Sequence, residues 1–297
     1  MKSPTTNTLD HVIIDGLKVS FFKDDNGGKH YRQRTHVEEA VSPFYGLVAA
    51  RLKPTHCIDI GANYGFTSMV MRRSFPGADV ISIEPVPWLC EMIERNFEEN
   101  ALEPPHVIQA IVGAEAETEH SFGINAKGGS QDNRVVPIDS DWGSLVTRAT
   151  TIDIITNETP SDSRFYVKVD TQGYEFFVFE GAENFFSRFN DWIVKAEFAP
   201  AWIESQGCDP AEFLRYLTDR FAVFEHPDRF QWNASSIFDG VGGALRTSDC
   251  DAFLNYVRSL NARGQGWVDL LIMPKTFLPM SQEIVRPLRE RFSRFIR

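Results

Sequence analysis

Short runs of apolar residues alternate with amphipathic segments along most of the chain. From residue 57 onward, apolar runs at 57–60, 80–83 and 107–112 predict buried strands, and the segments 66–73 and 88–100 have the apolar spacing of helices. The alternation returns after residue 150, with strands expected at 165–170, 192–198, 221–224 and 268–273 and helices at 176–186, 210–219 and 251–261. This order predicts an α/β fold whose mostly parallel sheet carries helices on both faces.

Three segments lie outside this alternation. Residues 1–54 contain a strand-like stretch at 12–19 and a helical pattern at 37–52, and we interpret them as an N-terminal extension and a candidate lid. Residues 113–150 are polar and rich in turn formers, which predicts an insertion with β structure over one end of the sheet. Residues 276–297 form a basic amphipathic tail, for which docking on its own domain is favoured over weak contact with a membrane surface. One main domain is therefore expected over residues 55–275.

Charge and composition narrow the partners. The formal net charge is -11, with 41 acidic and 30 basic residues, which counts against a nucleic-acid partner. The four cysteines form no CxxC pair, so neither a disulfide framework nor a metal cluster is expected. No apolar run has the roughly 18 residues that an integral membrane segment needs, and the N-terminus lacks the apolar stretch of a signal peptide. We expect a cytoplasmic protein. The sequence does not decide between a monomer and a homo-oligomer.

The run CIDIGANYGF (57–66) contains the most informative motif. A buried strand ends near Asp59, Gly61 and Gly65 follow, and a helix then begins, so the backbone can turn sharply and approach a ligand closely. The third glycine of a nicotinamide-binding GxGxxG motif is missing. An acidic residue here would repel a diphosphate but attract the ammonium and sulfonium groups of S-adenosylmethionine. The motif therefore favours a methyl donor over a dinucleotide.

A second motif, ISIEPVP (81–87), places an acid at the end of the next strand. Glu84 follows Gly65 by 19 residues, where its carboxylate can accept hydrogen bonds from both ribose hydroxyls of a nucleoside. Pro85 ends the strand. Either motif alone is weak, whereas the two in this order and at this separation favour a nucleoside-type methyl donor.

The third motif, YVKVDTQGYE (166–175), ends another buried strand in Asp170. Glu197 ends the following strand, WIVKAEF. Because ligands of open α/β sheets bind beyond the carboxyl ends of the strands, we expect Asp59, Glu84 and Asp170 to converge on one crevice with Glu197 at its rim. Lys168 shares a pleat face with Asp170, and we expect the two to pair. Capping of the next helix is the alternative role for both acids. For Asp170 a functional role is favoured over capping, whereas for Glu197 the two roles have equal weight.

Three segments together resemble the FkbM family of methyltransferases. They are CIDIGANYGF (57–66), IEPVPWLCEMIERNFEEN (83–100) and VKVDTQGYEFFVFEGAENFF (167–186), within a similarity that spans residues 57–200, about half of the chain. The resemblance implies a Rossmann-like class I methyltransferase fold, with seven strands of which the last is antiparallel, and S-adenosylmethionine as the cofactor. It also implies that TTIDII (150–155) is a short strand.

The resemblance implies roles for individual residues as well. It assigns binding of the methyl donor to Asp59, Gly61, Asn63, Gly65 and Glu84, and we add the adjacent Ala62 and Pro85. It places Asp170 and Glu175 on the substrate side. To these we add Tyr174, which is one of several aromatic residues able to stack on a sugar ring, together with Trp142, Trp202 and Trp232.

Methyl transfer to a hydroxyl needs a general base, or a divalent cation that acidifies the hydroxyl. Asp170 is the first candidate for the general base or for a metal ligand, with Glu197 and Glu175 as further candidates. Three carboxylates could form an oxygen-rich Mg²⁺ site, but the sequence alone does not assign one. His226, after the expected strand 221–224, is a further candidate base, and His36 a candidate substrate contact in the lid.

The expected activity is S-adenosylmethionine-dependent O-methylation of a sugar, glycan or other small natural product. An N-methyltransferase or a protein-directed methyltransferase on the same fold is the main alternative. A non-catalytic donor-binding domain is disfavoured by the intact Gly61, Gly65 and Glu84, and an NAD-dependent or nucleotide-sugar oxidoreductase by the missing third glycine.

Overall fold

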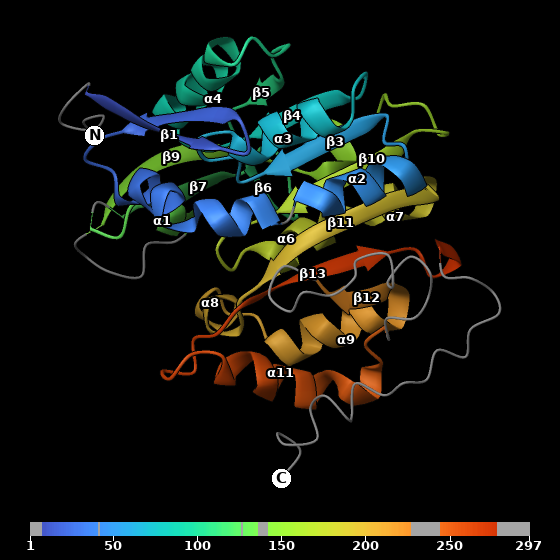
Figure 1. The fold of residues 1–297 in the computed structure, drawn as a ribbon. Helices are drawn as coiled ribbons and strands as arrows, with labels where there is room; N and C mark the ends of the chain where they lie inside the picture. The colour runs from blue at the N-terminus through green and yellow to red at the C-terminus, as the bar shows by residue number, and fades with distance from the viewer. Residues whose placement is uncertain (1–7, 41, 126, 136–141, 227–243, 278–297) are drawn as a thin grey trace.

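The computed structural model describes residues 8–40, 42–125, 127–135, 142–226 and 244–277, with side chains left out at 34–40, 42 and 43. Its centre is a seven-stranded sheet in the order β12-β13-β11-β10-β3-β4-β5 (Figure 1). β13 is antiparallel to both of its neighbours, and the other pairings are parallel. The strands are β3 (His56–Ile60), β4 (Asp79–Ile83), β5 (His106–Ile108), β10 (Arg164–Val169), β11 (Asp191–Phe198), β12 (Ala222–Glu225) and β13 (Val268–Met273).

Helices cover both faces of this sheet. One apolar cluster joins the sheet to α2 (Ser42–Arg51), α3 (Phe66–Ser74) and α4 (Pro87–Glu99). A second cluster joins its other face to α6 (Glu175–Glu180), α7 (Glu183–Arg188), α8 (Pro200–Ser205), α9 (Pro210–Arg220) and α11 (Cys250–Ser259). Within β10, Tyr166 belongs to the first cluster and Val167 to the second, because successive side chains of a strand point to opposite faces. The predicted α/β class with a mostly parallel sheet is confirmed.

Several expected elements differ in the structure. The predicted strand 107–112 divides into β5 and β6 (Ile111–Val112), and β6 pairs with the insertion instead of the main sheet. The predicted helix 176–186 divides into α6 and α7 at Gly181, where a side chain would meet the Gly113 carbonyl oxygen at 2.0 Å. α8 was not predicted.

The expectation of a strand at TTIDII was wrong. Residues Ile152–Ile155 form a short helix, α5, which begins because the Thr151 hydroxyl accepts a hydrogen bond from the Ile154 amide at 3.1 Å. The Asp153 carboxylate accepts hydrogen bonds from the amides of Asn184 and Phe185 at the start of α7. The segment therefore caps a neighbouring helix.

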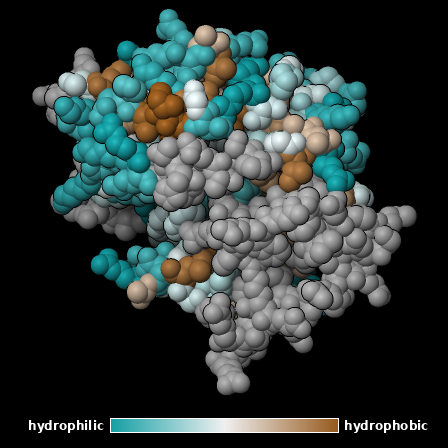
Figure 2. Space-filling model, in the orientation of Figure 1, coloured by the Kyte–Doolittle hydropathy of each residue, from teal (hydrophilic) through white to brown (hydrophobic). Residues whose placement is uncertain are grey.

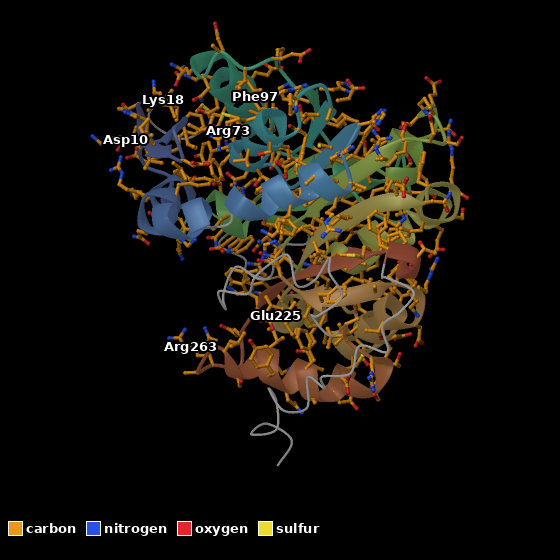
Figure 3. All side chains as sticks on the ribbon, turned by 45° about the vertical axis from the view of Figure 1, so that its right-hand side comes forward. Asp10, Lys18, Arg73, Phe97, Glu225 and Arg263 are labelled. Atoms are coloured by element: carbon orange, nitrogen blue, oxygen red, sulfur yellow. The ribbon has the colours of Figure 1, made fainter. Side chains whose placement is uncertain are left out.

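The N-terminal segment forms a hairpin and a helix. β1 (Leu9–Ile14) and β2 (Leu17–Phe22) pair around a turn at Asp15 and Gly16, where a single strand had been expected. α1 (Asn26–Ala40) replaces the expected polar loop. Asp25 supports its start by accepting the Gly28 amide at 3.0 Å. In Figure 3, Lys18 and Arg73 lie on this side of the molecule, where Lys18 pairs with Glu99 at 3.0 Å and Arg73 pairs with Asp15.

The insertion forms a second sheet beside α1. Its strands β6, β7 (Glu119–Ile124), β8 (Arg134–Val135) and β9 (Gly143–Thr150) follow the order β6-β9-β7-β8 (Figure 1). A short 3₁₀ helix, η1 (Ser130–Asp132), precedes β8 and contacts the start of α1, because Asp25 accepts hydrogen bonds from the Ser130 amide and hydroxyl at 2.9 and 2.7 Å.

The visible surface is mixed. In Figure 2 the upper part of the face is mostly hydrophilic, with small and separate hydrophobic areas that need no special explanation. Within the described ranges, the helices are too short or too polar to span a bilayer. Most of the predicted basic tail, residues 278–297, lies outside the described residues.

Candidate functional site

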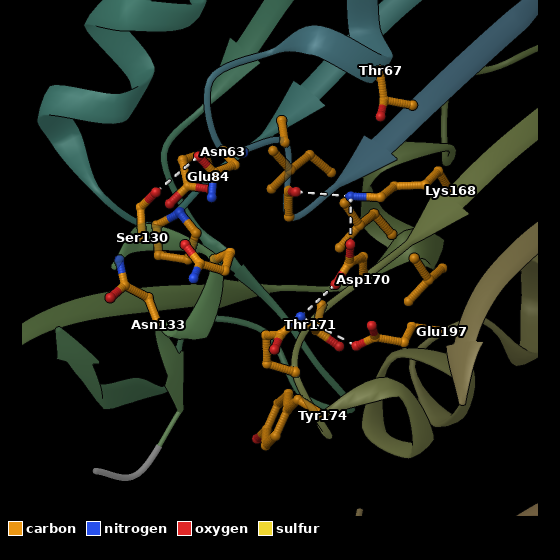
Figure 4. A pocket seen from close by; sticks show the side chains of 18 of the residues that line it. Asn63, Thr67, Glu84, Ser130, Asn133, Lys168, Asp170, Thr171, Tyr174 and Glu197 are labelled. Carbon is orange, nitrogen blue, oxygen red and sulfur yellow. Dashed lines mark hydrogen bonds and ion pairs between the residues drawn. The ribbon is translucent and has the colours of Figure 1, made fainter. Parts of the chain in front are cut away.

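A pocket of about 360 Å³ lies beyond the carboxyl ends of β3, β4, β10 and β11 (Figure 4). Its size is within the range of small-molecule sites, about 300–1,000 Å³. The loop after β3 and the insertion supply adjoining parts of the wall, since the Ser130 hydroxyl donates to Oδ1 of Asn63 at 3.2 Å, and α1 contributes His30 and Tyr31. The predicted candidates that line it are Gly61, Ala62, Asn63, Glu84, Pro85, Asp170, Tyr174, Glu197 and Trp202.

The loop after β3 depends on glycine at residue 61. Gly61 has φ +77°, and its amide and that of Ala62 donate to the Ile83 carbonyl at 3.0 and 3.1 Å. A β-carbon at Gly61 would lie 2.0 Å from the Asp170 carbonyl oxygen. Gly65 has φ +80° and precedes α3, and a β-carbon there would lie 3.1 Å from Ile93. Both positions therefore need glycine, and Gly61 needs it most.

Gly61→Ala should strongly destabilise the protein and disrupt the loop. Left-handed backbone strain costs about 1–3 kcal/mol, and the clash with the β10 loop adds roughly 1–3 kcal/mol. Urea unfolding measures the loss. Gly16→Ala is the matched control, because Gly16 also has φ +77° but has open space around its β-carbon position. Equal losses in the two variants would show that the close approach to Asp170 contributes nothing.

Asp59 lies behind the pocket wall, outside the residues that line the pocket. Its side chain is 0% exposed and accepts a hydrogen bond from the Ser68 hydroxyl at 2.6 Å. The other carboxylate oxygen lies 3.5 Å from Nζ of Lys168, which also donates to the Gly61 carbonyl at 2.9 Å. Asp59 therefore acts on the pocket through Lys168 and through the glycine loop.

Glu84 stands on the pocket wall at the end of β4. It is 4% exposed, and its two oxygens accept hydrogen bonds from the Asn63 amide at 2.9 Å and the Val86 amide at 3.0 Å. Burial raises the pKa of Glu84 to about 7, against the effect of these two hydrogen bonds. Asn63 adopts a left-handed conformation with φ +52°, which turns its amide to the carboxylate.

Charged side chains from neighbouring strands form the floor of the pocket. Lys168 pairs with Asp170 at 3.3 Å, as the sequence predicted, and Lys195 pairs with Asp269 at 2.9 Å. Glu197 stands directly opposite Asp269 in the register of β11 and β13. In the described part of the chain Glu197 makes no ion pair, and its carboxylate accepts one hydrogen bond, from Nε2 of Gln172 at 3.1 Å.

The pKa values of the two strand-end acids, Asp170 and Glu197, are shifted in opposite directions. Burial by itself would raise the pKa of Asp170, but the charge of Lys168 and the amide of Gln172 outweigh it and hold this pKa below its ordinary value. Burial raises the pKa of Glu197 well above its ordinary value, and the nearby Asp170, Glu175 and Asp269 act in the same direction. Neighbouring acids with separated pKa values are typical of acid–base sites.

Other predicted candidates lie in different surroundings. Glu175 is fully buried outside the pocket lining and accepts the Thr171 and Gly173 amides at 2.8 and 3.0 Å, so it supports the β10 loop. His226 is buried against the ring of Phe44 at 4.5 Å and is not among the pocket-lining residues.

The remaining candidates are aromatic or lie in the N-terminal helix. Tyr174 lines the pocket and packs against Phe177 at 4.4 Å. Trp142 and Trp202 flank the Arg134 guanidinium at 5.3 and 5.1 Å, which leaves less of their faces for a sugar. The side chain of His36 and the whole of Trp232 lie outside the described residues.

Sequence reasoning missed Lys195, Asp269, Gln172 and the contribution of Ser130. Lys195 precedes Glu197 by two residues, as Lys168 precedes Asp170, so the repeated K-x-acid pattern could have revealed it. Asp269 interrupts the apolar strand VDLLIM. Gln172 and Ser130 lie on loops, where no periodic pattern marked them.

The donor set does not fit a divalent cation. The described residues contain no group of three or more His, Cys, Asp or Glu side chains that could hold a metal ion. The two candidate metal ligands, Asp170 and Glu197, already have other partners. Asp170 is paired with Lys168, and Glu197 accepts a hydrogen bond from the Gln172 amide. We therefore derive no step through a metal.

Similar solved structures include an SAH-bound methyltransferase of Podospora anserina, with 10% identity, coverage of 83% of this chain and 85% of that chain, and a TM-score of 0.44. Another is an O-methyltransferase of Bacillus cereus in complex with SAH, with 11% identity, 78% coverage of each chain and a TM-score of 0.41. A third is precorrin-6y C5,15-methyltransferase of Geobacter metallireducens, with 8% identity, coverage of 79% and 87%, and a TM-score of 0.39. No curated protein matches significantly.

A family profile described as the methyltransferase FkbM domain matches residues 59–225, a span that contains the second and third motifs and all but the first two residues of the first. The match covers more than half of the 297 residues. The protein therefore belongs to the FkbM family of S-adenosylmethionine-dependent methyltransferases.

Proposed function

We propose that the protein methylates a hydroxyl group of a sugar, a glycan or another small polar natural product. The observation that carries the proposal is Glu197, a buried carboxylate at the pocket without an ion-pair partner among the described residues. A hydroxyl acceptor must lose a proton, and a carboxylate with a raised pKa is a suitable acceptor for it.

The lining of the pocket suits a cationic methyl donor. The carboxylates outnumber the lysines five to two, the residues being Glu84, Asp132, Asp170, Glu197 and Asp269 against Lys168 and Lys195. S-adenosylmethionine supplies a methyl group on a positively charged sulfur, and this charge is favoured in such surroundings. Glu84 would accept hydrogen bonds from the ribose hydroxyls. The loop at Gly61, Ala62 and Asn63 would lie against the methyl donor.

The acceptor would lie at the β10 and β11 end of the pocket. Glu197 would take the hydroxyl proton while the acceptor oxygen forms its bond to the methyl carbon and the carbon–sulfur bond breaks. Asp170, which Lys168 holds in its ionised form, would keep the region polar and orient Gln172. Accurate positioning of the two reactants supplies much of the remaining acceleration.

Matched alcohols and amines test the proposal. Cyclohexanol, phenol and methyl α-D-glucopyranoside would be compared with cyclohexylamine and aniline, with SAH release and product mass as readouts. We expect methylation on oxygen. Faster methylation of the amines would favour the N-methyltransferase alternative, and absence of any methylated hydroxyl compound despite bound S-adenosylmethionine would contradict the proposal.

The affinity for S-adenosylmethionine should fall as the pH is lowered through 7. Ribose hydroxyls donate to a carboxylate, and Glu84, with a pKa of about 7, is mostly protonated at pH 6 and mostly ionised at pH 8. If only the ionised form binds well, Kd should rise about tenfold between pH 8 and pH 6. Calorimetry at both pH values measures this change.

Glu84→Gln separates this effect from the titration of the ligand itself. The variant should bind more weakly at pH 8, and its Kd should vary only as far as the ligand titrates. The same pH dependence in wild type and variant would argue against Glu84 as the ribose contact.

A further inference from the structure

Gln172 connects the two strand-end acids of the pocket. It lies on the loop after β10, lines the pocket, and adopts a left-handed conformation with φ +58°. Such a conformation is uncommon for a residue other than glycine and is frequent at functional sites. From this position Nε2 donates to Asp170 at 2.8 Å and to Glu197 at 3.1 Å. Figure 4 shows the two acids from adjoining strand ends, with dashed lines converging between them.

These two hydrogen bonds determine which way the amide faces. An amide nitrogen has two hydrogens to donate, and both are directed to carboxylates. The reversed orientation would set the amide oxygen against two acceptor oxygens. The oxygen Oε1 is buried and has no hydrogen-bond partner in the described residues. A buried acceptor of this kind calls for a donor.

We propose that Gln172 is a specificity residue whose Oε1 binds a second hydroxyl of the acceptor, next to the hydroxyl that is methylated. The inference rests on the proposed O-methylation and narrows it to acceptors with hydroxyls on adjacent carbons, as in sugars and catechols.

The geometry explains why the two hydroxyls must be adjacent. Gln172 is hydrogen-bonded to Glu197, so its oxygen is separated from that carboxylate only by the width of one amide group and one hydrogen bond of 3.1 Å. Two donors that reach Glu197 and Oε1 together must lie close to each other. A neutral amide oxygen also suits a hydroxyl better than a cation. An acceptor with a single hydroxyl would leave Oε1 buried without a donor, which is the condition under which enzymes reject analogues most strongly.

Pairs of probes that differ by one hydroxyl test the proposal. Catechol would be compared with phenol, and cis-1,2-cyclohexanediol with cyclohexanol, by kcat/KM for SAH release. In the wild type we expect each diol to be preferred at least tenfold over its partner. In Gln172→Leu we expect this ratio to fall to near one, while the affinity for S-adenosylmethionine measured by calorimetry stays within about twofold. Gln33→Leu, an exposed position on α1 outside the pocket lining, is the matched control and should keep the wild-type ratio.

The outcomes separate this inference from the proposed function. A wild-type ratio near one, with methylation of phenol or cyclohexanol, would overturn the inference and leave O-methylation standing. A preference for diols that persists in Gln172→Leu would also overturn it. Failure to methylate any of the four probes, with S-adenosylmethionine bound, would overturn both. If Gln172→Leu does not fold, the wild-type ratio alone still decides between adjacent and single hydroxyls.

Discussion

Glu197→Gln should lower kcat for methylation of a hydroxyl by about 10²–10⁴-fold, the usual contribution of a general base. Glutamine keeps the size of the side chain and can still accept a hydrogen bond from Gln172, but it cannot take up a proton. The rate would be measured on the hydroxyl compound that the wild type methylates fastest. Since Glu197 stands at the β11 end of the pocket, the affinity for S-adenosylmethionine should change little.

Two controls make this result specific. Glu204→Gln alters an exposed glutamate that pairs with Arg258 on the surface, and it should leave kcat unchanged. Asp170→Asn should reduce kcat less than Glu197→Gln, because the pKa of Asp170 is held low and a weaker base contributes less. Full activity of Glu197→Gln, or a larger loss in Asp170→Asn, would transfer the role of base to Asp170.

The pH profile adds an independent readout. A base must be unprotonated to act, so kcat should rise with pH through the pKa of Glu197. Because burial raises that pKa, the rise should lie well above the ordinary range of a carboxylate. Glu197→Gln should remove this limb of the profile.

Much of the fold follows from apolar periodicity. The main-sheet strands β3, β10, β11 and β13 are largely buried, so their runs of Val, Ile and Phe stand out from the helices between them. Deviations arose where tertiary contacts decided the local structure. Gly181 interrupts a helical pattern because its backbone packs against Gly113, and Thr151 starts a helix by a side-chain hydrogen bond. Neither contact can be derived from periodicity.

The candidate site was predictable at the level of strand ends. Glu84, Asp170 and Glu197 all reach one pocket, because they follow strands whose carboxyl ends meet at one edge of the sheet. The sequence could not distinguish a residue on the pocket wall from one behind it. Asp59 lies one residue before the end of β3, and its side chain faces Lys168 inside the protein. Long-range contacts from the insertion, such as Ser130 to Asp25, were also beyond the reach of local patterns.

Lys168→Met should lower the free energy of unfolding by about 3–5 kcal/mol, the usual cost of removing one partner of a buried ion pair. The side chain of Lys168 is 12% exposed and neutralises two carboxylates, of which Asp59 is 0% and Asp170 37% exposed. Without Lys168, Asp59 loses its ion-pair partner and, among the described residues, retains the hydrogen bond from the Ser68 hydroxyl. Most of the loss should therefore come from Asp59, since solvent can screen Asp170. Urea unfolding at neutral pH would measure the change.

A second substitution identifies the source of this loss. Lys168→Met combined with Asp59→Asn should recover a large part of the stability, because no buried charge then lacks a partner. Arg148→Met is the control, because Arg148 makes an exposed pair with Glu117, and surface pairs contribute about 0–1 kcal/mol. An equally small loss in Lys168→Met, or no recovery in the double variant, would mean that Lys168 does not hold the glycine loop and the strand-end acids together by charge.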